Sequence, residues 1–162
     1  MHEASLNQMR HILSRWQGDA NVLDVGSYDV NGTYRPLVEQ RSWRYTGTDV
    51  EKGPNVDVVS PDPYHFPFAD NAFDVVISGS TMEHVQAIWL WVPELARVVR
   101  PGGMLAIITH TSYPYHRYPV DCWRILPDGG RYLFDLTGCL ERYDIRMYNE
   151  TDISLVAYKC AS

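Results

Sequence analysis

Short apolar runs alternate with helical segments along this chain, and this alternation limits its possible folds more than any other feature. Helical spacing of apolar residues predicts helices at 6–16, 31–40, 82–100 and 128–140. The intervening runs have the length and composition of buried strands, at 21–25, 43–50, 55–59, 73–78 and 104–109. Because apolar strands separated by helices bury both of their faces, we predict an α/β fold with a mostly parallel sheet.

The end of the chain departs from that alternation. Two segments of alternating polarity, 142–148 and 153–159, follow each other closely and predict an antiparallel pair. Pro93 is expected to interrupt the helix at 82–100, and Pro101-Gly102-Gly103 to end it before the next strand. With 162 residues and no visible linker, we expect one domain over 1–162.

Charge and composition exclude several classes of protein. The chain has 20 acidic residues against 14 Lys and Arg, a net charge of −6 and no basic run, so nucleic acid is not an expected partner. No apolar stretch approaches the roughly 20 residues that cross a membrane, and the polar N-terminus lacks a secretory signal. Three widely spaced cysteines form no disulfide framework, and we expect a cytoplasmic protein. No metal site is predicted, because the spacing of His110, His116, Asp121 and Cys122 matches no common ligand pattern.

Acidic residues and a glycine stand where the predicted strands end. Gly26 follows the first strand and Asp49 lies at the end of the second, where parallel sheets bind ligands. An acid at the second position can accept two hydrogen bonds from a ribose diol. The turn after the first strand holds Tyr28 and Asp29, and a carboxylate about 5 Å from a phosphate would cost roughly 3 kcal/mol. With Asp24 nearby, this edge favours the cationic S-adenosylmethionine over a dinucleotide.

Four motifs carry a resemblance to a known family: VLDVGSYDVNG, YTGTDV, DPYHFPFADNAFDVVIS and ELARVVRPGGMLAI. Over roughly 22–130 the chain resembles class I S-adenosylmethionine-dependent methyltransferases, in the methyltransferase type 11-like group. The resemblance implies a Rossmann-like, doubly wound sheet of seven strands in the order 3-2-1-4-5-7-6, with the last strand antiparallel, at minimal size. It also implies an N-terminal helix (1–17), a cofactor-binding half (22–110) and an acceptor loop, helix and final strand pair (111–162).

The resemblance assigns cofactor contacts by position. Asp24 is expected near the methionine amino group, Asp49 at the ribose and Asp62 at the adenine amine, with Pro63 or Tyr64 packing on the ring. The backbone carbonyl of Ser78 is expected to meet the methionine end. The full predicted set is Asp24, Gly26, Ser27, Tyr28, Asp49, Val50, Asp62, Pro63, Tyr64 and Ser78.

The chain departs from the family pattern at three places. Tyr28 stands where a second glycine is usual, and Pro63 has no backbone N–H to offer to adenine. Only residues 51–54 separate the second and third strands, so the helix that normally lies there is expected to be missing.

The predicted acceptor side lies in the loops after the fourth and fifth strands. Residues 110–124 gather histidine, arginine, tyrosine and aspartate in one short segment, and loops held by a rigid sheet commonly carry function. We expect His84 or His116 to take a proton from the acceptor, and Tyr113, Arg117 and Asp121 to orient it. The acceptor is expected to be a small molecule or a glycan-type group, methylated on oxygen or nitrogen.

Two other functions remain open at this point. A non-catalytic cofactor-binding or interaction module would fit the small size and the missing helix. A nicotinamide-dependent oxidoreductase fits poorly, because the chain lacks an intact GxGxxG turn and a Tyr-x-x-x-Lys pair. The aromatic residues and small size leave a homodimer possible.

Overall fold

The computed structural model describes residues 3–161, which form one seven-stranded sheet in the order β3-β2-β1-β4-β5-β7-β6. Neighbours from β3 to β5 pair in parallel, and β7 runs antiparallel to both β5 and β6. This confirms the predicted order and the antiparallel final pair. The strands are β1 (Asn21–Val25), β2 (Arg44–Asp49), β3 (Val58–Val59), β4 (Phe73–Gly79), β5 (Val99–His110), β6 (Leu140–Met147) and β7 (Asp152–Lys159).

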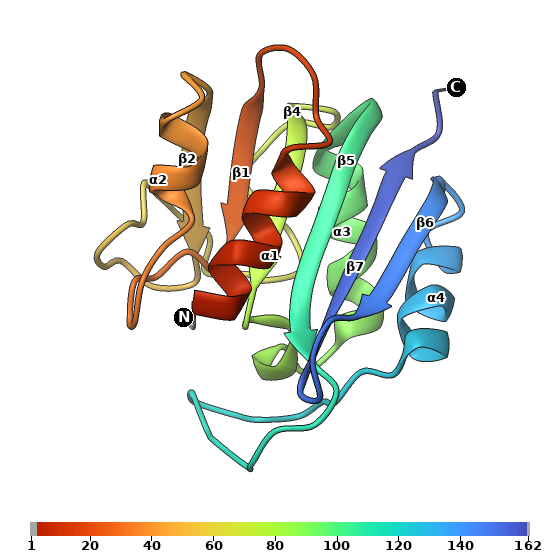
Figure 1. The fold of residues 1–162 in the computed structure, drawn as a ribbon. Helices are drawn as coiled ribbons and strands as arrows, with labels where there is room; N and C mark the ends of the chain where they lie inside the picture. Colours follow the sequence, from red (N-terminus) through yellow and green to blue (C-terminus); the bar gives the residue numbers. More distant parts are fainter. Residues whose placement is uncertain (1–2, 162) are drawn as a thin grey trace.

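Helices cover both faces of the sheet, as Figure 1 shows. They are α1 (Glu3–Leu13), α2 (Arg35–Glu39), α3 (Ile88–Val98) and α4 (Pro127–Asp135), with a short 3₁₀ turn, η1 (Met82–His84), after β4. Successive side chains of β5 point to opposite faces. Leu105 and Ile107 therefore join the core beneath α3 and α4, whereas Met104, Ala106 and Ile108 join the core beneath α1 and α2.

The prediction for 82–100 was wrong about the position of the break. The interruption lies at Val85, whose backbone is extended, and Pro93 lies inside α3. A proline at this place removes one helical hydrogen bond. Trp91 and Leu95 are buried on the face of α3 that meets the sheet, and this burial holds the helix together across the proline.

The prediction that Pro101-Gly102-Gly103 ends the helix before the fifth strand was wrong. These three residues lie within β5. The pairing of β4 with β5 shifts register between Phe73 and Val75, and Gly102 has a φ of 73°. The three residues thus form an irregular stretch of a longer strand, which is where a bulge tolerates proline and glycine.

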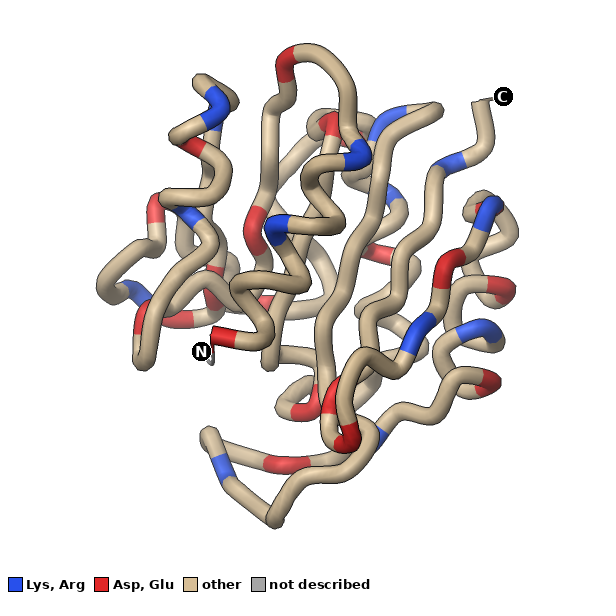
Figure 2. The backbone as a smooth tube through the Cα atoms, viewed as in Figure 1, with Lys and Arg blue, Asp and Glu red and all other residues tan. Residues whose placement is uncertain are grey.

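Other element ends differ from the predicted ones by a few residues. The third strand contains two residues instead of five, α1 ends at Leu13, α2 begins only at Arg35, and α4 ends at Asp135. As predicted, no helix lies between β2 and β3. None of the helices within 3–161 is long and apolar enough to cross a membrane. Lys and Arg are interspersed with Asp and Glu along the backbone in Figure 2.

Candidate functional site

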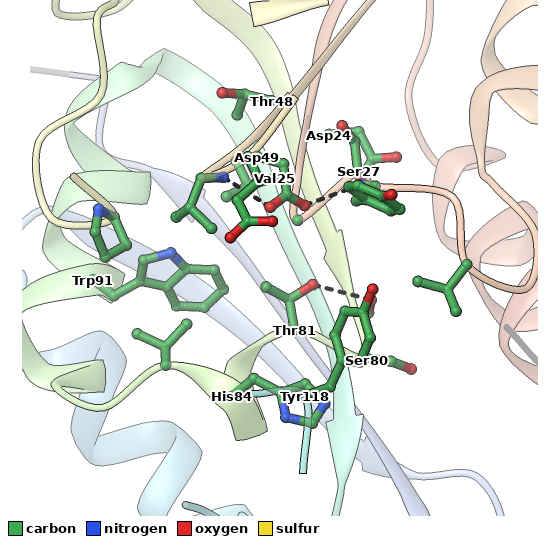
Figure 3. A pocket seen from close by; sticks show the side chains of 18 of the residues that line it. Asp24, Val25, Ser27, Thr48, Asp49, Ser80, Thr81, His84, Trp91 and Tyr118 are labelled. Atoms are coloured by element: carbon green, nitrogen blue, oxygen red, sulfur yellow. Dashed lines mark hydrogen bonds between the residues drawn. The ribbon is translucent and has the colours of Figure 1, made fainter. Parts of the chain in front are cut away.

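A cleft of about 930 Å³ opens beyond the carboxyl ends of β1, β2, β4 and β5. This is the edge at which open parallel sheets bind ligands, and the volume suits a nucleoside-sized molecule. Figure 3 shows the carboxylates of Asp24 and Asp49 near one another, and the ring of His84 farther along the cleft. We call these two regions the carboxylate end and the imidazole end.

The turn after β1 requires glycine at position 26. Gly26 has a φ of 78°, and its N–H donates to the carbonyl of Thr48 at 2.9 Å. A Cβ atom on Gly26 would lie 2.0 Å from Oγ1 of Thr81. The backbone between β1 and α2 can therefore pass close to the loop after β4 only without a side chain at this position.

Asp24 is a buried acid with one direct side-chain donor. Its side chain lies on β1 with the residue only 3% exposed, and Oδ2 accepts a 2.6 Å hydrogen bond from the hydroxyl of Tyr45. Nδ2 of Asn55 donates to that hydroxyl at 2.8 Å. Burial is the largest influence on the carboxyl and raises the pKa of Asp24 to about 7, against the opposing effect of the Tyr45 hydrogen bond.

Backbone N–H groups from two loops, the one after β1 and the one after β2, fix the carboxylate of Asp49 at the end of β2. Oδ2 accepts a hydrogen bond from the N–H of Tyr28 at 3.0 Å, and Oδ1 accepts one from the N–H of Val50 at 2.7 Å. The Tyr28 ring lies against Gly53, where an added Cβ would meet a ring carbon at 2.1 Å. Tyr28, which replaces the usual glycine, thus packs against the short connection between β2 and β3.

Aromatic rings crowd the imidazole end. The ring of His110 stacks on Tyr113 with a centroid separation of 4.5 Å, and His116 meets both Tyr113 and His84 edge-on at 5.1 and 5.0 Å. His110 ends β5 and His84 ends η1, whereas Tyr113 and His116 belong to the loop between β5 and α4.

That loop is attached to η1 by hydrogen bonds. The N–H of Cys122 donates to the carbonyl of Glu83 at 2.7 Å, and Nδ1 of His84 makes a 2.6 Å hydrogen bond with the carbonyl of Val120. The indole N–H of Trp123 donates to the carbonyl of Val85 at 2.8 Å. These contacts hold the loop across the mouth of the cleft.

Glu83, His110 and Asp152 form a buried charged group that the sequence analysis did not identify. Nε2 of His110 lies 3.2 Å from Oε1 of Glu83, and its Nδ1 lies 2.6 Å from Oδ1 of Asp152. Burial alone would lower the pKa of His110, but the two carboxylates outweigh it and raise that pKa. Burial likewise acts to raise the pKa of Glu83, and the nearby His110 lowers it overall. The one feature of the sequence that pointed to this group is a histidine, His110, at the end of the predicted fifth strand.

Most of the predicted cofactor contacts line the cleft, but two do not. Asp62 is exposed, and its Oδ1 accepts a hydrogen bond from the N–H of Tyr64 at 2.8 Å, so the carboxylate closes a turn. Ser78 is fully buried, and its hydroxyl donates to the carbonyl of Val25 at 2.7 Å. The predicted contacts that do line the cleft are Asp24, Gly26, Ser27, Tyr28, Asp49, Val50, Pro63 and Tyr64.

Four of the five predicted acceptor-side residues line the cleft: His84, Tyr113, His116 and Arg117. Asp121 lies behind them. Its Oδ1 accepts a 2.6 Å hydrogen bond from Arg124, and its Oδ2 accepts one from the N–H of His116 at 2.7 Å. Asp121 therefore fixes the backbone of the loop at His116 and does not line the cleft. Other lining residues are brought here only by the tertiary fold and were not predicted from the sequence; Ser60, Thr81 and Trp91 are among them.

Comparison with known sequences identifies a family. The profile described as "Methyltransferase domain" matches residues 23–107, more than half of the chain. An "Uncharacterized methyltransferase" from Mycobacterium sp. (strain KMS) is 34% identical over 105 residues, which cover 59% of this chain and 40% of that relative. The chain thus spans about 40% of the length of this curated relative.

Solved structures show the same fold at low sequence identity. A SAM dependent methyltransferase from Archaeoglobus fulgidus is 15% identical with a TM-score of 0.80, covering 97% of this chain and 94% of that one. The 1,6-didemethyltoxoflavin-N1-methyltransferase of Burkholderia thailandensis, crystallised with 1,6-didemethyltoxoflavin and S-adenosylhomocysteine, is 16% identical with a TM-score of 0.76. That match covers 98% of this chain and 79% of the other.

Proposed function

The chain belongs to the methyltransferase domain family, with the class I S-adenosylmethionine-dependent fold and S-adenosylmethionine as cofactor, and from this premise we propose that it methylates a small-molecule or glycan-type acceptor on oxygen or nitrogen. The observation that carries the proposal is one cleft with the buried Asp24 and the partly buried Asp49 at one end and imidazoles at the other. A cationic methyl donor and an acceptor that must lose a proton need these two environments side by side.

The residues of the carboxylate end fit the cofactor. S-adenosylmethionine carries a sulfonium and an ammonium group and no phosphate, so the carboxylate of Asp24 would attract it and would repel the phosphates of a dinucleotide. Asp49 does not discriminate between the two ligands, because both carry a ribose diol. Asp24 would hold the methionine amino group and Asp49 the ribose diol, with Pro63 and Tyr64 against the adenine ring. Asp62 does not line the cleft, so a hydrogen bond from the adenine amine to its carboxylate would need the cofactor to reach beyond the lining. Ser78 would contact the methionine end only through its backbone carbonyl.

When bound, S-adenosylmethionine supplies an electrophilic methyl group, and the protein must position the acceptor and remove its proton. A carbonyl oxygen only accepts hydrogen bonds, so Nδ1 of His84 must donate to Val120, and the Nε2 of the neutral ring keeps its lone pair. His116 has the same arrangement, with Nδ1 at 3.0 Å from the carbonyl of Pro114. Either Nε2 can accept the acceptor proton. Tyr113 and Arg117 would orient the acceptor, and Asp121 would position His116.

The test combines binding and turnover. We expect S-adenosylmethionine and S-adenosylhomocysteine to raise the melting temperature of the protein, and NAD to leave it unchanged. Methyl transfer from labelled cofactor is then measured on panels of phenols, amines and sugars, for the unmodified protein and for His84→Ala and His116→Ala. Cofactor binding without transfer to any acceptor would favour the non-catalytic module, and the absence of a shift with either cofactor form would overturn the proposal.

A further inference from the structure

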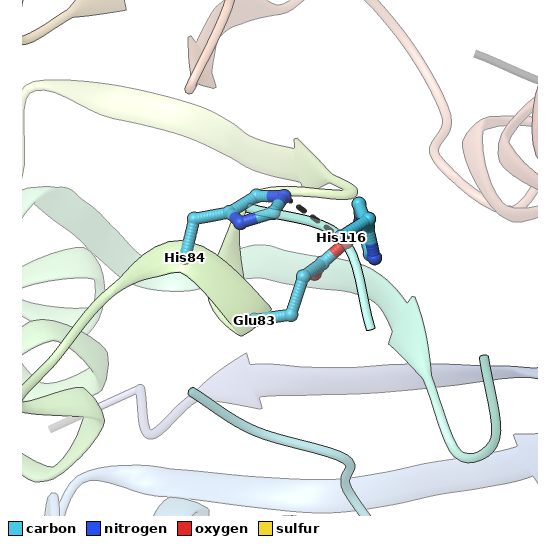
Figure 4. A group of neighbouring side chains, drawn as sticks. All are labelled: Glu83, His84 and His116. Atoms are coloured by element: carbon cyan, nitrogen blue, oxygen red, sulfur yellow. Dashed lines mark ion pairs between the residues drawn. The ribbon is translucent and has the colours of Figure 1, made fainter. Parts of the chain in front are cut away.

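Three side chains with metal-binding groups converge at the imidazole end. Glu83 and His84 come from η1, and His116 comes from the loop that η1 holds in place. One ligand atom from each of the three lies within 4.8 Å of the others, and Figure 4 shows the three side chains facing one another. The pair for which the two atoms are known, Nε2 of His84 and Oε1 of Glu83, is separated by 4.0 Å.

Both imidazoles have the backbone carbonyl partner that metal-binding histidines usually have. In such sites one ring nitrogen donates to a carbonyl or carboxylate, and the other nitrogen binds the metal. Nδ1 of His84 lies 2.6 Å from the carbonyl of Val120, and Nδ1 of His116 lies 3.0 Å from that of Pro114. Each neutral ring therefore presents a lone pair on Nε2.

Glu83 supplies an oxygen that lacks a hydrogen bond. The side chain is completely buried, and its Oε2 accepts a 2.9 Å hydrogen bond from Thr109. Oε1 has no hydrogen-bond donor within residues 3–161, although Nε2 of His110 lies at ion-pair distance, 3.2 Å away. Oε1 thus faces His110 in an ion pair and keeps a lone pair with which it can bind a cation.

We propose that Glu83, His84 and His116 bind a divalent transition-metal ion at the acceptor end of the cleft. Two imidazoles and one carboxylate suit Zn²⁺, Mn²⁺ or Fe²⁺, whereas Mg²⁺ and Ca²⁺ prefer sites made of oxygen alone. Bonds of about 2.1 Å require ligand atoms roughly 3–3.5 Å apart, so the side chains close by about 1 Å on loading. Three protein ligands leave a coordination position open toward the cleft.

Metal uptake at this site can be measured without any methyl transfer. It does change the role of the two rings: with a metal bound, both are ligands, and the general-base role described above belongs to the metal-free protein. The competing arrangement is a protonated His110 that alone balances the charge of Glu83, and in that case the protein binds no metal here.

Metal uptake by the purified chain tests the proposal. After treatment with a chelator, ZnCl₂ and MnCl₂ are titrated separately by calorimetry, with the metal content measured after dialysis. We expect one Zn²⁺ per chain, and a loss of affinity of at least about 100-fold in His116→Ala and in His84→Ala, because even the hydrogen-bond partners of metal ligands contribute about 10–100-fold. Matched controls are His11→Gln, an exposed histidine on α1, and Cys122→Ser, an exposed thiol on the same loop; both should bind as the unmodified protein does.

Glu83→Gln is a weaker test, because a change at a fully buried charge can unfold the protein. Replacing the half-exposed His116 avoids this problem, and circular dichroism of each variant reports on its fold. A second readout is the visible absorption of bound Co²⁺, which reports ligand geometry and should change in His116→Ala. Failure of the unmodified protein to retain Zn²⁺, or equal retention in the two histidine variants, would overturn the inference and leave the methyltransferase proposal unaffected.

Discussion

The hydroxyl of Tyr45 donates a 2.6 Å hydrogen bond to the buried carboxyl of Asp24, on the neighbouring strand of the sheet. Burial disfavours the charged form of this acid and raises its pKa to about 7, although the hydrogen bond from Tyr45 acts to lower that pKa. An acid kept in such a place costs stability once it ionises. The opposite charge of a ligand can compensate for that cost.

The first prediction concerns pH and the cofactor. An ammonium group favours the charged form of Asp24, so binding should release a proton from the carboxyl at pH values below about 7. We expect affinity to fall by up to about tenfold for each pH unit below 7. Calorimetry between pH 5 and 7.5, in two buffers with different heats of ionisation, measures the cofactor affinity and the number of protons released on binding. Asp24→Asn should bind more weakly at pH 7.5 and lose the dependence; an unchanged pH profile would contradict the assignment.

The same variant should stabilise the ligand-free protein at high pH. The folded-state pKa of about 7 lies above the ordinary 3.8. The stability contribution of the protonated form is therefore complete below pH 3.8 and is lost as pH rises through 7. The difference corresponds to about 4 kcal/mol at most, and asparagine does not ionise. Urea unfolding at pH 8 should show Asp24→Asn to be more stable than the unmodified protein, and at pH 4 the two should be similar. A less stable variant at pH 8 would show that the carboxylate supports the fold.

The variant Tyr45→Phe removes the hydrogen bond to Asp24 and keeps the aromatic ring. Without that donor the charged carboxyl is less favoured, so its pKa should rise further. The midpoint of the pH dependence of cofactor affinity should move upward by about one to two units, because a charge-assisted hydrogen bond contributes about 1.5–3 kcal/mol. The matched control is Tyr132→Phe, an exposed tyrosine on α4, for which the midpoint should not move.

Asp49 gives a prediction about binding alone. The backbone N–H groups of Tyr28 and Val50 hold its carboxylate at the cleft, so its loss removes hydrogen bonds to a ribose diol without opening the core. Asp49→Ala should weaken cofactor binding by about 1–3 kcal/mol. Asp19→Ala, an exposed acid in the connection before β1, serves as the control of equal charge. Equal affinities in the two variants would exclude the ribose assignment.

The sheet and the carboxylate end could be predicted from sequence because local patterns determine them. Apolar runs specify buried strands; Gly26 directly follows the first of these runs, and Asp49 lies at the end of the second. Asp62 lies outside the cleft lining, because an Asx turn uses its carboxylate locally, and its expected contact with the adenine amine stays a prediction. The helix break near Pro93 was misplaced because burial of the apolar face of α3 overrides the proline.

The imidazole end could be predicted only in part, because it depends on contacts between distant segments. His84 and His116 were identified as candidates, but their proximity to Glu83 follows from the hydrogen bonds that hold the β5–α4 loop on η1. The partnership of His110 with Glu83 and Asp152 joins three separate elements. No periodicity or spacing in the sequence encodes such a contact.

The last prediction compares two glycines that have opposite surroundings. Gly26→Ala would place a Cβ 2.0 Å from Oγ1 of Thr81, at a φ of 78° that disfavours a side chain, so both the steric clash and the backbone conformation oppose it. Gly129 lies exposed in α4 with no heavy atom within 4 Å of an added Cβ. Gly129→Ala should therefore stabilise the protein by about 0.5–1 kcal/mol, because alanine favours the helix. Gly26→Ala should lower the melting temperature and also weaken cofactor binding. Calorimetric melting of both variants, with and without cofactor, checks the pair; a Gly26→Ala protein with unchanged affinity would mean that the turn after β1 does not approach the cofactor.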